Sequence, residues 1–451
     1  MAAPWSGWER VFVGSVTLVG LALRLVGYTV APDRHDTPDE VQFAWAGISV
    51  LRRQPPTSWS YLPEYHAPLW LVTPDGIGWP LVTPWFDHPP LFGLLVGGAA
   101  LLSGATSLAS VTTAAIRLPS ILLAVACIPL AFVLARRVGG RVPAVLGTAL
   151  FATAPVAVLF GRSVEPEALL APLLLVALIA VHRLMTGEGG RGTLAVLALA
   201  CVLAPLAKVP GVAVGGACGV ILFMGGRPKA ALVAVGGAAL GLAAFGAYGA
   251  AYDWNLFVGV FGEQAAHRTG VSGAIDFIAD PAGLNRRAHD GWWLLGWMAV
   301  GLLLVRDRLS PAQALLAWPA VAYAAAMLVM TDERVTTFGW YRIAVYPVLY
   351  LAAGWLAQAL LRRRPSPVAT IAVLITGGTS VGVAPLPGAI APTVAAALMA
   401  IVIGLLALAS WRPESARLQT IGRLTARGAL GLVLVGNVAG SLGLESGYLR
   451  L

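Results

Sequence analysis

The chain has 451 residues, of which 58% are apolar and 11% charged, and its mean hydropathy is +0.79. Because soluble domains carry about 25% charged residues, this composition excludes an ordinary soluble protein and predicts a polytopic membrane protein. The formal net charge of +9 does not indicate a nucleic-acid partner, since the basic residues are scattered between apolar segments, as in loops that stay in the cytoplasm.

Apolar runs long enough to cross a bilayer, which takes roughly 20 residues, recur along the chain and predict an all-α protein with about thirteen transmembrane helices. The predicted spans lie near 11–31, 116–135, 142–161, 168–184, 193–207, 211–226, 230–250, 291–305, 311–330, 342–361, 366–385, 392–411 and 429–444. With the amino terminus inside, the inner loops contain more than half of the lysines and arginines. Basic residues accumulate in cytoplasmic loops, so this orientation suits a multi-pass protein of the plasma membrane.

Two long polar segments, about 32–115 and 251–290, then lie on the outer side. The first contains the apolar stretch PPLFGLLVGGAALLSG at 89–104, which is short for a span. If this stretch crossed the membrane, the basic group at 136–141 would lie outside, against the charge rule. It is therefore expected to form a juxtamembrane helix at the outer interface.

The sequence TPDEVQFAWAG, at 37–47, directly follows the first predicted span. Thr37, Pro38 and Glu40 are typical of a helix start, with a capping threonine, a proline at the first helical position and a capping-box glutamate. This accounts for Glu40 but not for Asp39, whose carboxylate at the outer membrane face is a candidate general base. We expect the helix start to hold Asp39 in place.

Other polar residues that are costly near a membrane also fall at the outer ends of the predicted spans. They are Asp87 and His88 in FDHPPLFG, Arg117 in IRLPS, Arg162, Glu165 and Glu167 in GRSVEPEALL, Lys208 in PLAKVPG, and Tyr341 and Arg342 in FGWYRIAVYP. Taken singly, an acid at a helix start stabilises the helix dipole, and a lysine can extend to the interface. Together, acids and cations at one membrane face indicate a functional site. Carboxylates provide a general base, and Lys208, Arg117 and Arg342 provide a cradle for a phosphate.

These motifs resemble those of the GT-C superfamily of polyprenyl-phosphate-dependent glycosyltransferases, and within it the protein O-mannosyltransferase and lipid A aminoarabinose transferase type. The resemblance extends over roughly residues 20–360. It rests on six motifs in series, namely PDEVQFAWA after the first span, DHPPL, RLPS, the EPE turn, the lysine of PLAKVPG, and YRIAVYP.

The resemblance implies the GT-C fold and an inverting glycosyltransferase. Such an enzyme moves a sugar from a polyprenyl-phosphate donor to an acceptor hydroxyl on the extracytoplasmic side of the membrane. Asp39 would deprotonate the acceptor, and Glu40 would support it or position a substrate. The implied substrate-binding residues are Asp87, Arg117, Arg162 and Tyr341, the phosphate contacts His88, Lys208 and Arg342, and the pair Glu165 and Glu167, one of which would orient the acceptor or the sugar.

The sequence also departs from the aminoarabinose branch. Gln42 stands where that branch carries a basic residue, and His88 stands where it carries a lysine, which argues against aminoarabinose as the sugar. Mannose, arabinose, glucose and amino sugars stay open, and so do a protein, a glycolipid and a wall glycan as acceptors. No cofactor is predicted, and a divalent metal held by Asp39, Asp87 and His88 is an alternative.

Two other functions fit the composition. A transporter or lipid flippase would place polar residues near the bilayer midplane, whereas these gather at the outer face. A catalytically inactive relative that scaffolds a cell-envelope complex would not need Asp39 and Lys208. On the leading hypothesis, residues 1–361 form the catalytic membrane module. Residues 362–451 form C-terminal scaffold helices.

Overall fold

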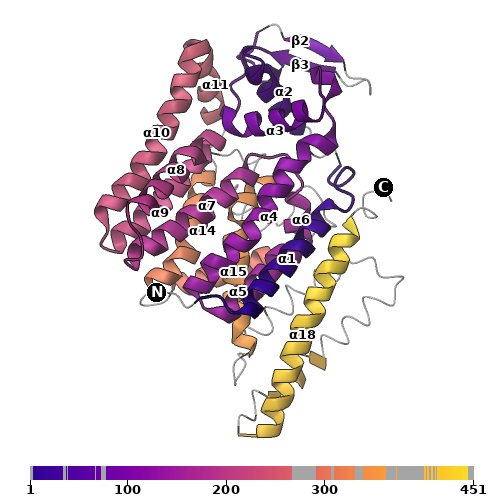
Figure 1. The fold of residues 1–451 in the computed structure, drawn as a ribbon, viewed down its shortest axis with the longest axis vertical. Helices are drawn as coiled ribbons and strands as arrows, with labels where there is room; N and C mark the ends of the chain where they lie inside the picture. Colours follow the sequence, from indigo (N-terminus) through magenta and orange to yellow (C-terminus); the bar gives the residue numbers. More distant parts are fainter. Residues whose placement is uncertain are drawn as a thin grey trace.

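The computed structural model of the chain is a bundle of helices, covered at one end by a smaller layer that contains a sheet (Figure 1). It describes residues 4–33, 37, 39–66, 68–72, 78–266, 291–305, 309–330, 339–361 and 416–444, with single residues between 372 and 415. The predicted spans 366–385 and 392–411 lie almost entirely outside the described residues. Pro38 also lies outside them.

The bundle confirms the prediction of a mostly helical, multi-pass membrane protein. Its helices are α1 (Gly7–Leu25), α4 (Thr113–Val138), α5 (Arg141–Thr153), α6 (Pro155–Phe160), α7 (Glu167–Met185), α8 (Arg191–Ala207), α9 (Val212–Met224), α10 (Pro228–Tyr252), α13 (Trp292–Leu304), α14 (Pro311–Met330), α15 (Tyr346–Ala357) and α18 (Ala416–Leu442). Helix α11 (Trp254–Ala266) follows α10, and the 3₁₀ turns are η1 (Leu108–Ser110), η2 (Val209–Gly211), η3 (Gly339–Val345) and η4 (Gln358–Leu361). Among the described helices, α4, α7, α10 and α18 are long and apolar enough to cross a membrane. The number of thirteen spans stays a prediction.

The predicted span 142–161 is divided into α5 and α6. Pro155 causes the break, because proline has no N–H with which to continue the hydrogen bonds of α5. Arg24, buried in α1, compensates for the break by donating hydrogen bonds to backbone oxygens on both sides of it. Its partners there are the carbonyl groups of Phe151 (3.3 Å), Ala152 (3.1 Å) and Ala157 (3.2 Å).

Helix α18 is longer than the span predicted at 429–444. It begins at Ala416, so Arg417, Arg423 and Arg427 belong to a helix and not to the expected inner loop. Arginine is a good helix former. A search for apolar runs detects only the apolar part of such a helix, which explains the error.

Helices α2 (Glu40–Leu51) and α3 (Pro90–Leu102) form most of the smaller layer, and the helix predicted within 89–104 is confirmed. The two helices approach closely through glycines. A Cβ atom at Gly47 would overlap the carbonyl group of Gly93, and one at Gly97 would overlap the backbone of Ile48. Because α3 also contacts α4 and α8, this packing holds α2 over the end of the bundle.

A three-stranded antiparallel sheet, which the all-α expectation misses, completes this layer (Figure 1). The strands are β1 (Ser58–Trp59), β2 (Leu69–Val72) and β3 (Gly78–Val82), in the order β1-β3-β2. Trp59 and Leu69 pair with Leu81 from opposite sides. Runs of aromatic and aliphatic residues between prolines and glycines are typical of short strands.

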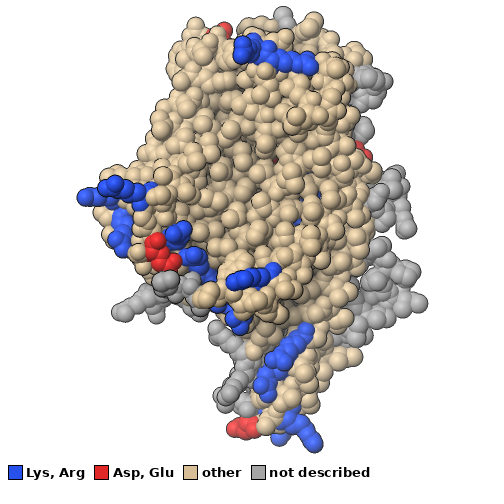
Figure 2. All heavy atoms as spheres, in the orientation of Figure 1, with Lys and Arg blue, Asp and Glu red and all other residues tan. Residues whose placement is uncertain are grey.

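The charges on the surface agree with a membrane protein. On the face drawn in Figure 2, lysine and arginine side chains gather at the lower end and along α18, and a broad band above them carries almost no charge. Large apolar side chains such as Leu18, Phe223 and Leu232 are more than 60% exposed. Apolar surface of this kind suits contact with lipid, since charges in the bilayer are costly.

Candidate active site

Helix α2 begins at Glu40, and its N-cap is Asp39, whose side chain makes no capping hydrogen bond. The predicted capping box is therefore wrong. The hydroxyl of Thr37 donates to the carbonyl group of Asp33 (3.2 Å), and the carboxylate of Glu40 binds Arg117. A buried guanidinium group is a stronger partner for a carboxylate than the backbone N–H of a helix start.

Glu40 and Arg117 form a buried ion pair that joins α2 to α4. The Nε atom of Arg117 lies 3.0 Å from both carboxylate oxygens, and its Nη2 atom lies 2.8 Å from Oε2. The same guanidinium group donates to the carbonyl oxygens of Tyr28 (2.7 Å) and Pro32 (2.9 Å). The backbone N–H of Val164 donates to Glu40 Oε1 (3.2 Å). Every nitrogen of the Arg117 guanidinium group thus has a protein partner, and the phosphate contact stays a prediction.

Arg162 has a similar structural place. Its Nη2 atom donates to the carbonyl oxygen of Leu23 (2.6 Å) near the end of α1, and its Nη1 atom donates to that of Ala31 (3.3 Å). Arg162 and Arg117 thus hold the loop that leads from α1 to Asp39 through hydrogen bonds to its backbone carbonyl groups. The structure therefore supports a positioning role for both arginines.

Lys208 lies in a second buried group of charges. Helix α7 begins at Glu167, and α8 ends one residue before Lys208, which has an extended backbone. The Nζ atom of Lys208 lies 2.5 Å from Glu167 Oε1 and 4.0 Å from the centre of the Tyr341 ring. A cation over an aromatic ring is attracted by the ring's negative face. Three segments far apart in the chain therefore meet at one point.

Asp39 lies close enough to Lys208 for their charges to interact. Burial raises the pKa of Asp39 to about 6; the positive charge of Lys208 opposes this rise, and the negative charges of Glu167 and Glu40 add to it. A general base works best when its pKa lies near the operating pH. Asp39 meets that requirement.

Glu165, in the turn before α7, is buried in the same group. Burial raises its pKa well above the ordinary value, and the negative charges of Asp39 and Glu167 raise it further. Within the described part of the chain, its Oε1 atom has no hydrogen-bond partner. Burial and the neighbouring negative charges therefore favour the protonated form of Glu165, whose carboxyl group can donate a hydrogen bond.

Asp87 is held by two residues that the sequence does not single out. The hydroxyl of Tyr65 donates to Asp87 Oδ1 (2.9 Å), and the side-chain amide of Gln264 donates to the Asp87 carbonyl oxygen (3.1 Å). Burial raises the pKa of Asp87 to about 6, and the negative charge of Asp39 contributes to this rise. Neither Tyr65 nor Gln264 belongs to a recognisable motif, so no sequence signal points to them.

The remaining predicted residues are packed among aromatic rings. The His88 ring lies 5.1 Å from that of Phe43 and 5.7 Å from that of Trp85. Arg342 is fully buried, with its Cζ atom 5.3 Å from the centre of the Trp293 ring. Their contacts with a donor phosphate stay predictions.

The structure thus brings only some of the predicted residues together. The residues that it brings together are Asp39, Glu165, Glu167, Lys208 and Tyr341, with Asp87 within electrostatic reach of Asp39. In the described part of the chain, no three His, Cys, Asp or Glu side chains are grouped closely enough to hold a metal ion. Asp39, Asp87 and His88, which the sequence offers as the ligands of a divalent metal, therefore do not form such a group.

Solved structures of known proteins share this fold. The chain is similar to ArnT from Cupriavidus metallidurans bound to undecaprenyl phosphate, with a TM-score of 0.55 and 16% identity over 98% of this chain and 78% of ArnT. ArnT in the apo state gives a TM-score of 0.54 and 16% identity, over 98% and 77% of the two chains. For AglB from Archaeoglobus fulgidus, in complex with an inhibitory peptide and a dolichol-phosphate, the TM-score is 0.48 and the identity 14%, over 93% and 56%. The likeness to the two ArnT structures shows that the chain has the GT-C fold, as the motifs predict.

The family comparison is more specific but covers less of the chain. The model of the family described as dolichyl-phosphate-mannose-protein mannosyltransferase matches residues 87–249. This segment contains the motifs from DHPPL to PLAKVPG. None of the curated proteins matches the sequence.

Proposed function

We propose that this protein is an inverting glycosyltransferase that moves a sugar from a polyprenyl-phosphate donor to an acceptor hydroxyl, with Asp39 as the general base. The observation that carries the proposal is the buried group in which the charge of Lys208 acts on Asp39. A carboxylate with a pKa of about 6 beside a cation suits proton transfer next to an anionic leaving group.

In this reaction Asp39 accepts the proton of the acceptor hydroxyl while the hydroxyl oxygen attacks the anomeric carbon. The new bond forms on the face opposite the phosphate. The bond from the anomeric carbon to the phosphate oxygen breaks, and polyprenyl phosphate leaves with the electron pair. Lys208 and Arg342 stabilise the charge on the leaving phosphate. One displacement of this kind inverts the anomeric centre.

The other members of the group have supporting roles. The buried carboxyl group of Glu165 forms a hydrogen bond with the sugar or the acceptor, and Glu167 holds Lys208 in position. Glu40, fixed by Arg117, holds the start of α2 and thereby the backbone of Asp39. Preorganised groups of this kind do not have to reorganise during the reaction.

We place the site on the extracytoplasmic side of the plasma membrane. The basic clusters lie where α4 ends and α5 begins, near the C-terminal end of α7, with Arg136 and Arg141 bound to Glu9 and Arg137 bound to Glu188 just after α7. Basic residues mark the cytoplasmic side of membrane proteins. This sidedness requires a donor whose lipid presents the sugar at the outer leaflet.

The donor and the acceptor are proposed at the level of chemical class. The undecaprenyl phosphate bound to ArnT, which shares the fold, supports a polyprenyl phosphate as the carrier. The mannosyltransferase family match makes mannose the first sugar to test, before arabinose, glucose and amino sugars. A protein, a glycolipid and a wall glycan are the acceptors to compare.

The test is the variant Asp39→Asn in the full-length protein, assayed with radiolabelled polyprenyl-phosphate mannose. We expect transfer to fall about 10²- to 10⁴-fold, the usual contribution of a general base, with donor binding and melting temperature retained. The matched control is Glu188→Gln, which removes a carboxylate at the opposite end of α7. Undiminished transfer by Asp39→Asn would refute the assignment of the base. Movement of intact donor across vesicles, without sugar release by the wild type, would instead identify a flippase.

A further inference from the structure

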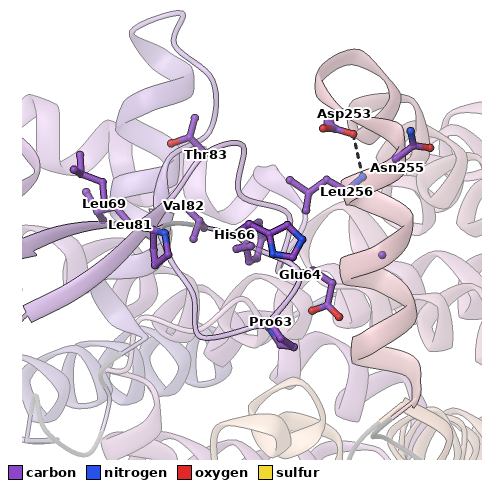
Figure 3. A pocket seen from close by; sticks show the side chains of 13 residues that line it. Pro63, Glu64, His66, Leu69, Leu81, Val82, Thr83, Asp253, Asn255 and Leu256 are labelled. Atoms are coloured by element: carbon purple, nitrogen blue, oxygen red, sulfur yellow. Dashed lines mark hydrogen bonds between the residues drawn. The ribbon is translucent and has the colours of Figure 1, made fainter.

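A cleft of about 790 Å³ opens beside the candidate active site, between the first outer segment and α11. Figure 3 shows its two walls, with Leu69 and Leu81 at the end of the sheet on one side and Asp253 and Leu256 of the α10–α11 region on the other. The described residues that line it are Pro63, Glu64, Tyr65, His66, Pro68, Leu69, Leu81, Val82, Thr83, Asp253, Asn255, Leu256 and Gly259. The volume falls within the range of about 300–1,000 Å³ that is usual for ligand pockets.

The chemistry of the lining favours a ligand that donates hydrogen bonds. Glu64, Asp253 and Asn255 offer acceptor oxygens, and no lysine or arginine occurs among these described lining residues. The Oε2 atom of Glu64 is buried and has no hydrogen-bond partner in the described part of the chain. Apolar surface from Leu69 and Leu256 lies between the polar groups. An anionic ligand would therefore meet repulsion here, whereas hydroxyl groups would find acceptors.

Both walls of the cleft are bonded to the same residue of the candidate active site. Tyr65 lines the cleft and donates its hydroxyl to the Asp87 carboxylate, and Gln264 of α11 donates to the Asp87 carbonyl oxygen. The charge of Asp39 acts in turn on Asp87. Tyr65 and Asp87 thus connect the cleft with the group around the proposed base.

We propose that this cleft binds the sugar units of a neutral glycan acceptor and directs its terminal hydroxyl toward Asp39. This inference rests on the proposed function and names the acceptor class for it. The polar groups bind the hydroxyls of the glycan, and the apolar side chains contact the C–H faces of its rings. A phosphorylated glycolipid is disfavoured because the described lining residues include two acidic side chains, one histidine and no lysine or arginine.

A peptide acceptor fits the cleft less well. An extended peptide usually adds to a sheet edge through a row of free backbone groups. Of the two edge strands, only β2 contributes a described lining residue, Leu69 at its start, and the neighbouring Pro68 has no N–H to donate. The side chains that line the cleft, and not a sheet edge, therefore determine what it binds.

Gly259 allows the cleft to be blocked without disturbing the core. It lies on an exposed face of α11, where an added Cβ would sit 3.5 Å from Glu64 Cγ, an ordinary contact. Gly259→Trp therefore places a large side chain in the cleft. Gly262→Trp is the matched control, because Gly262 is exposed on the same helix, does not line the cleft and has no atom within 4 Å of an added Cβ.

The experiment measures binding alone, so that it does not depend on transfer. Full-length wild type and both tryptophan variants in nanodiscs are titrated, without donor, against three fluorescent neutral oligosaccharides built from mannose, glucose and arabinose. A Ser/Thr-rich peptide and a phosphorylated glycolipid are titrated in parallel. Repeating the titration with Asp39→Asn separates this inference from the assignment of the base, since glycan binding should survive in that variant.

We expect at least one neutral oligosaccharide to bind the wild type and Gly262→Trp alike, and to bind Gly259→Trp at least about tenfold more weakly, a loss of about 1.4 kcal/mol. Equal binding by the two tryptophan variants would overturn the site. The glycan assignment would be overturned if none of the oligosaccharides bound. It would also be overturned if only the peptide or the glycolipid bound in a manner sensitive to Gly259→Trp.

Discussion

Arg117 and Lys208 are both buried at the same end of the bundle, yet their surroundings differ. Arg117 faces a single carboxylate, and all of its nitrogens donate to protein groups. Lys208 lies among carboxyl groups that include Glu167, Glu165 and Asp39. Glu165 Oε1 and Glu167 Oε2 have no hydrogen-bond partner within the described residues.

This difference separates a structural ion pair from a candidate site. A buried pair whose hydrogen bonds are complete positions the chain and has little left to offer a substrate. Several carboxyl groups held together in a buried place shift one another's pKa values, and such shifts cluster at functional sites. Burial alone does not distinguish the two groups, whereas the number of unfilled hydrogen-bonding positions does.

The largest effect on stability is expected for Arg117→Met, because Glu40 would be left as a buried charge without its partner. We expect the free energy of unfolding to fall by about 3–5 kcal/mol, the usual cost of breaking a buried ion pair. Thermal unfolding in detergent measures this, and the exposed Arg191→Met should change it by less than about 0.5 kcal/mol. Unchanged stability together with lost donor binding would instead make Arg117 a phosphate ligand.

Lys208→Met should act mainly on transfer. We expect kcat/KM to fall about 10- to 100-fold, since a hydrogen bond to a charged group contributes about 1.5–3 kcal/mol. Stability should fall less than in Arg117→Met, because Glu167 can take up a proton once its partner is gone. If Lys208→Met unfolds most of the protein while the folded fraction transfers sugar normally, Lys208 is a structural residue like Arg117 and not part of the site.

The pH dependence of transfer tests the electrostatics of Asp39. Its pKa is raised to about 6 by burial, so the carboxylate is ionised above that pH and protonated below it. Transfer should therefore decline as the pH falls through about 6. Because Lys208 favours the ionised form, the midpoint should move to higher pH in Lys208→Met. If the residual activity of Asp39→Asn keeps the same acidic limb, another group is responsible for it.

The smallest effect is expected for Glu165→Gln. Burial and the negative charges of Asp39 and Glu167 raise the pKa of Glu165 and so favour its protonated form, and glutamine has nearly the same shape as that form and the same lack of charge. The rate of transfer should change less than about twofold, and the free energy of unfolding should change by less than about 0.5 kcal/mol, as for a neutral replacement. A tenfold loss of transfer at pH 7 would show that the ionised form of Glu165 is needed.

Local patterns predict most of the bundle and also show where prediction fails. Each described helix of the bundle lies on a predicted apolar run, and α3 follows from its length and the charge rule. The sheet is missed because its strands are only two to five residues long. The capping box is wrong because the partner of Glu40 is Arg117, which lies 77 positions away along the chain.

By itself, the sequence determined that this is a multi-pass membrane protein and which polar residues lie at the ends of its helices, because hydropathy and charge placement can be read within each segment. Only the tertiary structure decided which of those residues hold the chain in position and which share a site with Asp39. The physical reason is distance: the state of a buried charge depends on the groups within a few ångströms of it. For Asp39 and Glu40 those groups come from segments far along the chain.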